Sequence, residues 1–106
     1  MRKMREPNTY KILGVKLSES IFNEVKADAM ANNISVPCWI ADAVALFVGA
    51  APKVIGHHYE PCNHPDIRFG VSLETYERVN DCAEDFGGGK KLPLTIIIKS
   101  AIIECL

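Results

Sequence analysis

The sequence predicts a mostly α-helical protein with a two-stranded antiparallel β-ribbon, built from two tandem strand-helix-helix copies in the order β-α-α-β-α-α. Residues 11–17 return as residues 67–73, with matching glycine, valine and leucine 56 positions later. Pro37 and Pro93 are separated by the same interval, and a fixed period of this size indicates repeated structural units. One unit of about 45 residues buries too little apolar surface to fold alone, so both copies are expected to share one core.

The first copy contains signals for a strand and two helices. Apolar and other residues alternate over residues 12–17, which predicts a strand with one buried face. Ser18 is then expected to cap an amphipathic helix. Asn32 and Asn33 are suited to a left-handed helix end, and Ser35 is expected to cap a second helix that carries proline in its first turn.

The second copy repeats this order with a compensated shift. Val79 follows Val25 by 54 residues instead of 56, and the three glycines at 87–89 restore the interval before the last segment. Residues 94–98 are rich in β-branched side chains and taken alone would pass for a buried strand. Their counterpart in the first copy is helical in pattern, so the repeat predicts a helix there.

These signals divide the chain into four segments that form one compact domain. They are a basic N-terminal arm (1–9), the first copy (10–48), a linker (49–65) and the second copy (66–106). The linker contains many turn-forming residues and has no helical or strand period.

Composition places the chain among ordinary globular proteins. It has 106 residues, of which 48% are hydrophobic and 24% charged, with a net charge of −1. No run is long enough to span a bilayer, and no apolar signal core follows the basic start, so a cytoplasmic protein without a membrane partner is expected. The four cysteines form no close pair and are expected to be reduced and mostly buried.

At this point the chain resembles the ribbon-helix-helix superfamily of DNA-binding proteins, to which Arc and MetJ belong. The resemblance rests on residues 13–20 (LGVKLSES) and 33–35 (NIS) in the first copy and on residues 69–74 (FGVSLE) in the second. It covers nearly the whole chain apart from the arm and the linker. Most members are homodimers of short chains, whereas this chain resembles the tandem form, a single-chain pseudodimer.

The resemblance implies that the ribbon enters the major groove and that outward strand residues contact base edges. The expected base contacts are Ile12, Gly14, Lys16, Arg68, Gly70 and Ser72. The arm, the first strand and the amino ends of the second helix of each copy, expected near residues 35–36 and 91–92, would contact phosphates. The expected phosphate contacts are Arg2, Lys3, Arg5, Lys11, Ser35, Val36, Lys90 and Lys91.

The implied function is sequence-specific binding of double-stranded DNA, by a transcriptional regulator such as a repressor or by a DNA-architectural accessory factor. Ile12, Gly14 and Gly70 offer no side-chain hydrogen bonds, however, and residues 55–106 carry five Lys/Arg against eight Asp/Glu. The alternative is therefore a small inhibitor or adaptor that uses the same surface to bind a protein target.

The last helix raises the question of self-association. Four isoleucines surround this short segment, namely Ile97, Ile98, Ile102 and Ile103. They would mediate pairing of two chains if they lie at the surface. The alternative is that all four fill the shared core.

No catalytic residue and no cofactor are predicted, since the serines are explained as caps and no glycine-rich loop follows a strand. All three histidines lie in the linker. With a neighbouring cysteine they form a set of metal-compatible side chains: His57, His58, Cys62 and His64. Their spacing matches no standard zinc motif, so a polar loop without metal is favoured and a structural zinc site is the alternative.

Overall fold

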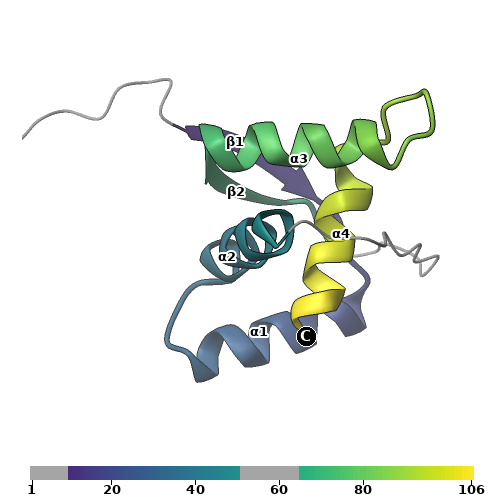
Figure 1. The fold of residues 1–106 in the computed structure, drawn as a ribbon. Coiled ribbons are helices and arrows are strands. Elements are labelled where there is room, and N and C mark those ends of the chain that lie inside the picture. Colours follow the sequence, from purple (N-terminus) through teal and green to yellow (C-terminus); the bar gives the residue numbers. More distant parts are fainter. Residues whose placement is uncertain (1–9, 51–64) are drawn as a thin grey trace, which may run out of the picture.

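The computed structural model describes residues 10–50 and 65–106 of the chain (Figure 1). In this part four helices accompany one two-stranded antiparallel sheet. The elements in chain order are β1 (Tyr10–Val15), α1 (Glu19–Ala31), α2 (Val36–Gly49), β2 (Ile67–Ser72), α3 (Leu73–Asp85) and α4 (Leu94–Cys105). The mostly helical class with an antiparallel ribbon, predicted from the repeat, is confirmed.

The register of the ribbon coincides with the repeat in the sequence. Leu13 of β1 lies opposite Phe69 of β2, and these two residues are 56 positions apart, so each is the repeat counterpart of the other. On either side of this central pair, Ile12 lies opposite Gly70 and Gly14 lies opposite Arg68. The two strands are therefore related approximately by a twofold rotation about the Leu13–Phe69 pair.

Serine hydroxyls begin three of the four helices. The backbone N–H of Ile21 donates to Ser18 Oγ at 3.3 Å, and that of Cys38 donates to Ser35 Oγ at 3.3 Å. Ser72 Oγ accepts from the backbone N–H of Thr75 at 3.1 Å. Because a serine cap pairs an amide that the first turn leaves unpaired, these hydroxyls set the helix starts. The predicted left-handed end of the first helix is confirmed at Asn33, where φ is 58°.

Residues 94–98 are helical, as the repeat predicts, but α4 begins later than expected. Its first residue is Leu94 and its N-cap is Pro93, whose side chain makes no capping bond. The amino end of this helix therefore does not lie at residues 91–92. In α2 the Ser35 hydroxyl caps a helix that starts just before Pro37, but the counterpart of Ser35 in the second copy is Lys91, which has no side-chain acceptor for such a cap.

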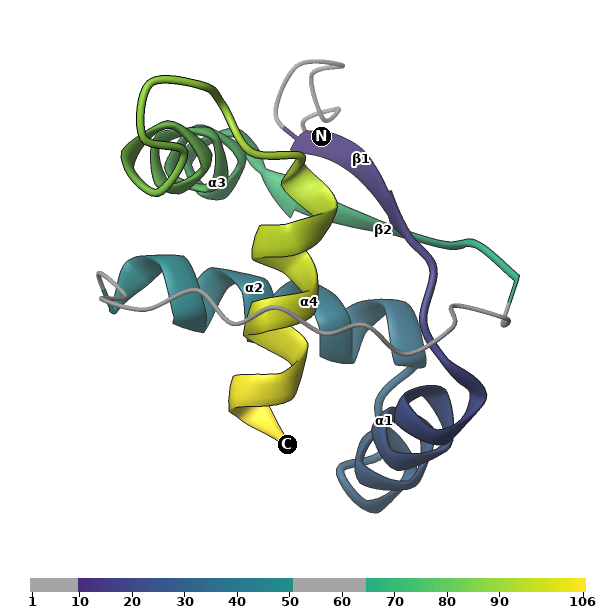
Figure 2. The ribbon, with the colours of Figure 1, turned by 90° about the vertical axis from the view of Figure 1, so that its right-hand side faces the viewer.

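One core is made from both copies. The inner face of β2 buries Phe69 and Val71. Beneath it, Ile40 of α2 meets Ile97 and Ile98 of α4, which are all nearly inaccessible. Figure 2 shows α4 beginning beside the ribbon and running across α2 to the carboxyl end. Each such side chain contributes about 1.5–3 kcal/mol when fully buried.

The two copies are packed unequally around this core. α3 contacts α2, α4 and both strands, whereas the main neighbour of α1 is α2. In Figure 1, α2 separates α1 from the ribbon. β1 is correspondingly less buried than β2, since its first three residues are exposed.

No single helix in the described ranges is long and apolar enough to cross a membrane. α1 and α2 reach the required length and composition only as a pair, and this pair is bent by 96°.

Candidate nucleic-acid interface

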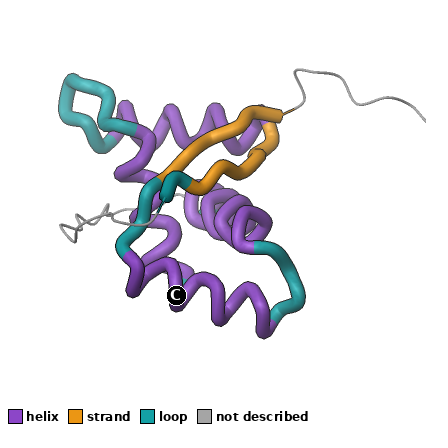
Figure 3. Tube along the Cα trace, turned by 180° about the vertical axis from the view of Figure 1, so that it is seen from behind, coloured by secondary structure: helices purple, strands orange, loops and turns teal. Residues whose placement is uncertain are grey.

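The outer face of the ribbon carries the residues that the sequence predicts as base contacts. Arg68 exposes 79% of its side chain and Ile12 is 56% exposed. Gly70, Ser72 and Lys16 are exposed as well, and Gly14 is half-buried. Figure 3 shows this side of the molecule, with the strands in front of the helices. Alternation along the strands thus brings five of the six predicted residues to one face, and Lys16 follows directly after β1.

An aspartate that the prediction did not include lies on this face. The carboxylate of Asp66 lies over Gly14, where a Cβ would meet its two oxygens at 3.0 and 3.1 Å. Asp66 Oδ2 is also 3.6 Å from Arg68 Nε. Both side chains are substantially exposed, so this pair adds at most about 1 kcal/mol to stability and can open easily.

The second glycine of the ribbon is covered by apolar groups. A Cβ on Gly70 would lie 3.4 Å from Tyr10 Cδ2 and 3.6 Å from Ile12 Cδ1. Tyr10, like Asp66, was missed by sequence reasoning. Tyr10 lies two residues before Ile12, and Asp66 lies two residues before Arg68. The alternation that places Ile12 and Arg68 on the outer face could therefore have identified Tyr10 and Asp66 as well.

The predicted phosphate contacts that the structure describes lie in three separate places: on β1, at the start of α2 and in the α3–α4 turn. Lys11 has its Nζ 5.8 Å from the centre of the Tyr76 ring, a cation–π distance that holds it toward α3. Ser35 caps α2, with half-buried Val36 after it. Lys90 and Lys91 are exposed in the α3–α4 turn, where Lys91 Nζ donates to Asn80 Oδ1. The three remaining candidates, Arg2, Lys3 and Arg5, lie outside the described residues.

The predicted linker set of His57, His58, Cys62 and His64 also lies outside the described residues. Within the described ranges no group of three His, Cys, Asp or Glu side chains is arranged to hold a metal ion. The three described cysteines are free thiols, but Cys38 and Cys105 are exposed, so the expectation of mostly buried thiols is wrong for them. Each lies near one end of its helix, where fewer neighbours cover it.

The thiols of Cys82 on α3 and Cys105 on α4 are poorly suited to nucleophilic chemistry. Desolvation by burial raises the pKa of Cys82, and the carboxylates of Asp85 and Asp81 raise it further. The pKa of Cys105 is raised first by burial and then by Glu104. Because the thiolate is the reactive form, both side chains are less reactive than an ordinary cysteine at neutral pH.

Three of the four isoleucines proposed for self-association lie in the core. Ile97, Ile98 and Ile102 are at most 1% exposed, and Ile103 is half-buried. The structure therefore favours the alternative in which these side chains fill the core of one chain.

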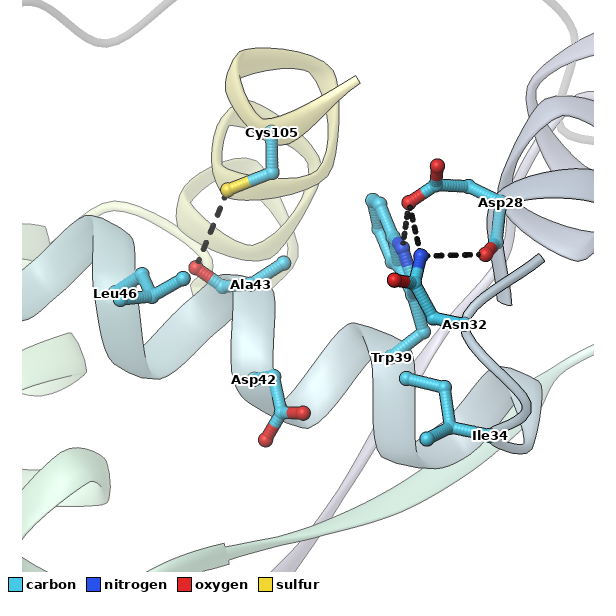
Figure 4. A pocket seen from close by; sticks show the side chains of 8 residues that line it. All are labelled: Asp28, Asn32, Ile34, Trp39, Asp42, Ala43, Leu46 and Cys105. Atoms are coloured by element: carbon cyan, nitrogen blue, oxygen red, sulfur yellow. Dashed lines mark hydrogen bonds between the residues drawn. The ribbon is translucent and has the colours of Figure 1, made fainter. Parts of the chain in front are cut away.

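A separate hollow of about 410 Å³ lies between α1, α2 and the end of α4 (Figure 4). Trp39 Nε1 donates to Asp28 Oδ2 at 2.6 Å, and Asn32 Nδ2 donates to the Asp28 carbonyl oxygen at 2.8 Å. The carboxylate of Asp42 also borders the hollow. The Trp39 bond attaches α2 to α1, whereas the Asn32 bond lies at the end of α1 itself, so Asp28 has a structural role.

Replacing Asp28 by alanine is expected to lower the free energy of unfolding by about 1–2 kcal/mol, because the buried indole N–H of Trp39 loses a charged acceptor. Denaturant titration followed by circular dichroism measures this. Asp42→Ala is the matched control, since it removes an exposed carboxylate from the same hollow and should change stability by less than about 0.5 kcal/mol. Equal effects of the two changes would contradict the structural role of Asp28.

Comparison of the chain with protein-family models, with curated proteins and with solved structures found no match. Function is therefore argued from the geometry of the ribbon.

Proposed function

We propose that this chain binds double-stranded DNA through the outer face of the β1–β2 ribbon, and that it acts in the cytoplasm as a transcriptional regulator or DNA-architectural accessory factor. The observation that carries this proposal is the antiparallel ribbon with an exposed outer face, on which Arg68 exposes 79% of its side chain, together with exposed Lys16 directly after β1.

The size of the ribbon supports this proposal. Paired strands are about 4.8 Å apart, and the major groove of B-DNA, about 12 Å wide, admits a two-stranded ribbon. Arg68 has the side chain best suited to bidentate contact with guanine. Lys16 would contact guanine or a neighbouring phosphate.

We further propose that the two copies form a single-chain pseudodimer. The pairing of Leu13 with its repeat counterpart Phe69 supports this arrangement, since a twofold axis through the ribbon requires such a pair. The unequal packing of α1 and α3 is a departure from that symmetry. A ribbon with two different strands does not require a palindromic site.

Selection of bound fragments from a random duplex library tests the proposal, followed by a salt titration of the best fragment. We expect a sequence-specific fragment whose affinity falls steeply with salt, because phosphate contacts release counterions. Arg68→Ala should relax base preference, whereas Arg78→Ala should not, because Arg78 pairs with Glu74 on α3. Removing residues 1–8 should weaken binding to all sequences alike. No enrichment at low salt would overturn the proposal.

A second candidate function is binding of a protein target through the same face. The observation that favours it is that Tyr10 and Ile12 cover Gly70 and the Asp66 carboxylate lies over Gly14 on the same face, since apolar and acidic groups are unhelpful against phosphates. An apolar protein interface would respond only weakly to salt. The same titration therefore separates the two functions.

A further inference from the structure

The two halves of the ribbon's outer face carry opposite chemistry at equivalent positions. Tyr10 and Ile12 on β1 correspond to Asp66, directly before β2, and to Arg68 on β2, 56 residues later in each case. Each pair lies beside the glycine of the opposite strand. The apolar pair covers Gly70, and the charged pair accompanies Gly14. The ribbon is therefore symmetric in its strand register and asymmetric in the groups it presents.

Gly14 allows the Asp66 carboxylate to occupy its position. Any side chain at residue 14 would begin with a Cβ 3.0 Å from Asp66 Oδ2 and 3.1 Å from Oδ1, tighter than ordinary contact. With glycine there, the carboxylate stays on the outer face, and its Oδ2 lies 3.6 Å from Arg68 Nε. A guanidinium donor and a carboxylate acceptor are thus presented side by side.

This pair matches the major-groove edge of a G·C base pair. Guanine offers two acceptors, N7 and O6, which suit arginine, and cytosine offers the N4 amino donor, which suits a carboxylate. Where Asp66 meets O6 of guanine or O4 of thymine instead, two acceptors face each other and binding is weakened. The carboxylate therefore contributes to discrimination more than to affinity.

The other half of the face has the chemistry to contact a thymine. Ile12 is 56% exposed and its Cδ1 lies above Gly70, so its methyl groups are available at the surface. The C5-methyl group of thymine is the one apolar group that a base pair presents in the major groove.

We propose that the ribbon recognises an asymmetric DNA site, with Asp66 and Arg68 contacting a G·C step and Ile12 contacting a thymine-bearing step, and that Asp66 determines specificity. This inference rests on the proposed DNA-binding function. The protein target considered above is its competitor, and the experiment distinguishes them.

The test is selection from a random duplex library with the wild-type chain, Asp66→Ala and Gly14→Ala. For the wild type we expect a non-palindromic site that pairs a G·C step with a thymine-bearing step. Asp66→Ala should reduce discrimination for cytosine at one position roughly tenfold, as loss of a good base contact does. It should also raise affinity for unrelated sequences, because a negative charge near phosphates is removed. Gly14→Ala displaces the Asp66 carboxylate, so it should also reduce discrimination for cytosine and raise affinity for unrelated sequences.

Asp42→Ala is the control, since it removes one exposed carboxylate from α2, away from the ribbon, and should leave base preference unchanged. A palindromic wild-type site, or an Asp66→Ala variant with unchanged base preference, would overturn this inference while DNA binding stands. A wild-type chain that enriches no fragment at low salt would overturn DNA binding and this inference together.

Discussion

Replacing Ile97 by alanine is expected to lower the free energy of unfolding by about 2–5 kcal/mol, which is the cost of a large cavity in a packed core. Ile97 is completely buried in α4, and Ile40 of α2 is equally inaccessible. The two residues come from different copies of the repeat but belong to the same cluster. Ile40→Ala should therefore have an effect of the same size.

Denaturant titration followed by circular dichroism and by the fluorescence of Trp39, the single tryptophan, measures both variants. One transition is expected by both probes, because α2 and α4 unfold together when they share a core. Leu46→Ala is the control, since Leu46 is 69% exposed and its loss should cost under about 1 kcal/mol. Two separate transitions would show that the copies fold as independent domains.

Replacing Gly87 by alanine is expected to destabilise the protein by about 3 kcal/mol, because the added methyl group collides with backbone atoms. A Cβ there would lie 1.5 Å from the carbonyl oxygen of Lys90 and 2.9 Å from that of Ala83. Both are backbone atoms, so the turn must open before the methyl group fits. That turn also holds the bond from the N–H of Leu92 to the Ala83 carbonyl, which directs the chain into α4.

Gly88→Ala is the matched control in the same turn. Gly88 has a φ of 59° and nothing within 4 Å of its Cβ position, so alanine meets only the left-handed penalty of about 1–2 kcal/mol. Comparison of denaturation midpoints at equal slope measures the difference. A Gly87→Ala variant as stable as Gly88→Ala would contradict the close approach of Lys90 to Gly87.

Much of the fold could be predicted because its signals are local. Ser18 and Ser35 cap the helices they were expected to cap, and Asn33 ends α1 in the left-handed region. The outward positions of Ile12, Arg68 and Gly70 on the strands also follow from alternation, since successive strand residues face opposite sides. The start of α4 is later than the repeat predicts because the counterpart of the Ser35 cap is Lys91, which cannot accept a capping hydrogen bond.

The composition of the candidate site was less predictable. Asp66 enters it because its side chain extends laterally across the ribbon over Gly14 of the other strand. Tyr10 covers Gly70 in the same way. Such contacts depend on which residues of the two strands lie opposite each other. The sequence of one strand does not specify this register, because its partner strand lies far away in the chain.

By itself, the sequence determined the element order, the caps and the faces of the strands, because these depend on propensities and periods within a few residues. Only the tertiary structure decided which neighbours those faces meet. It placed Leu13 opposite Phe69, buried Ile97, Ile98 and Ile102 against α2, and set α1 apart from the ribbon. The physical reason is that burial and cross-strand contact are long-range, since each joins residues from different copies whose proximity exists only once the chain has packed.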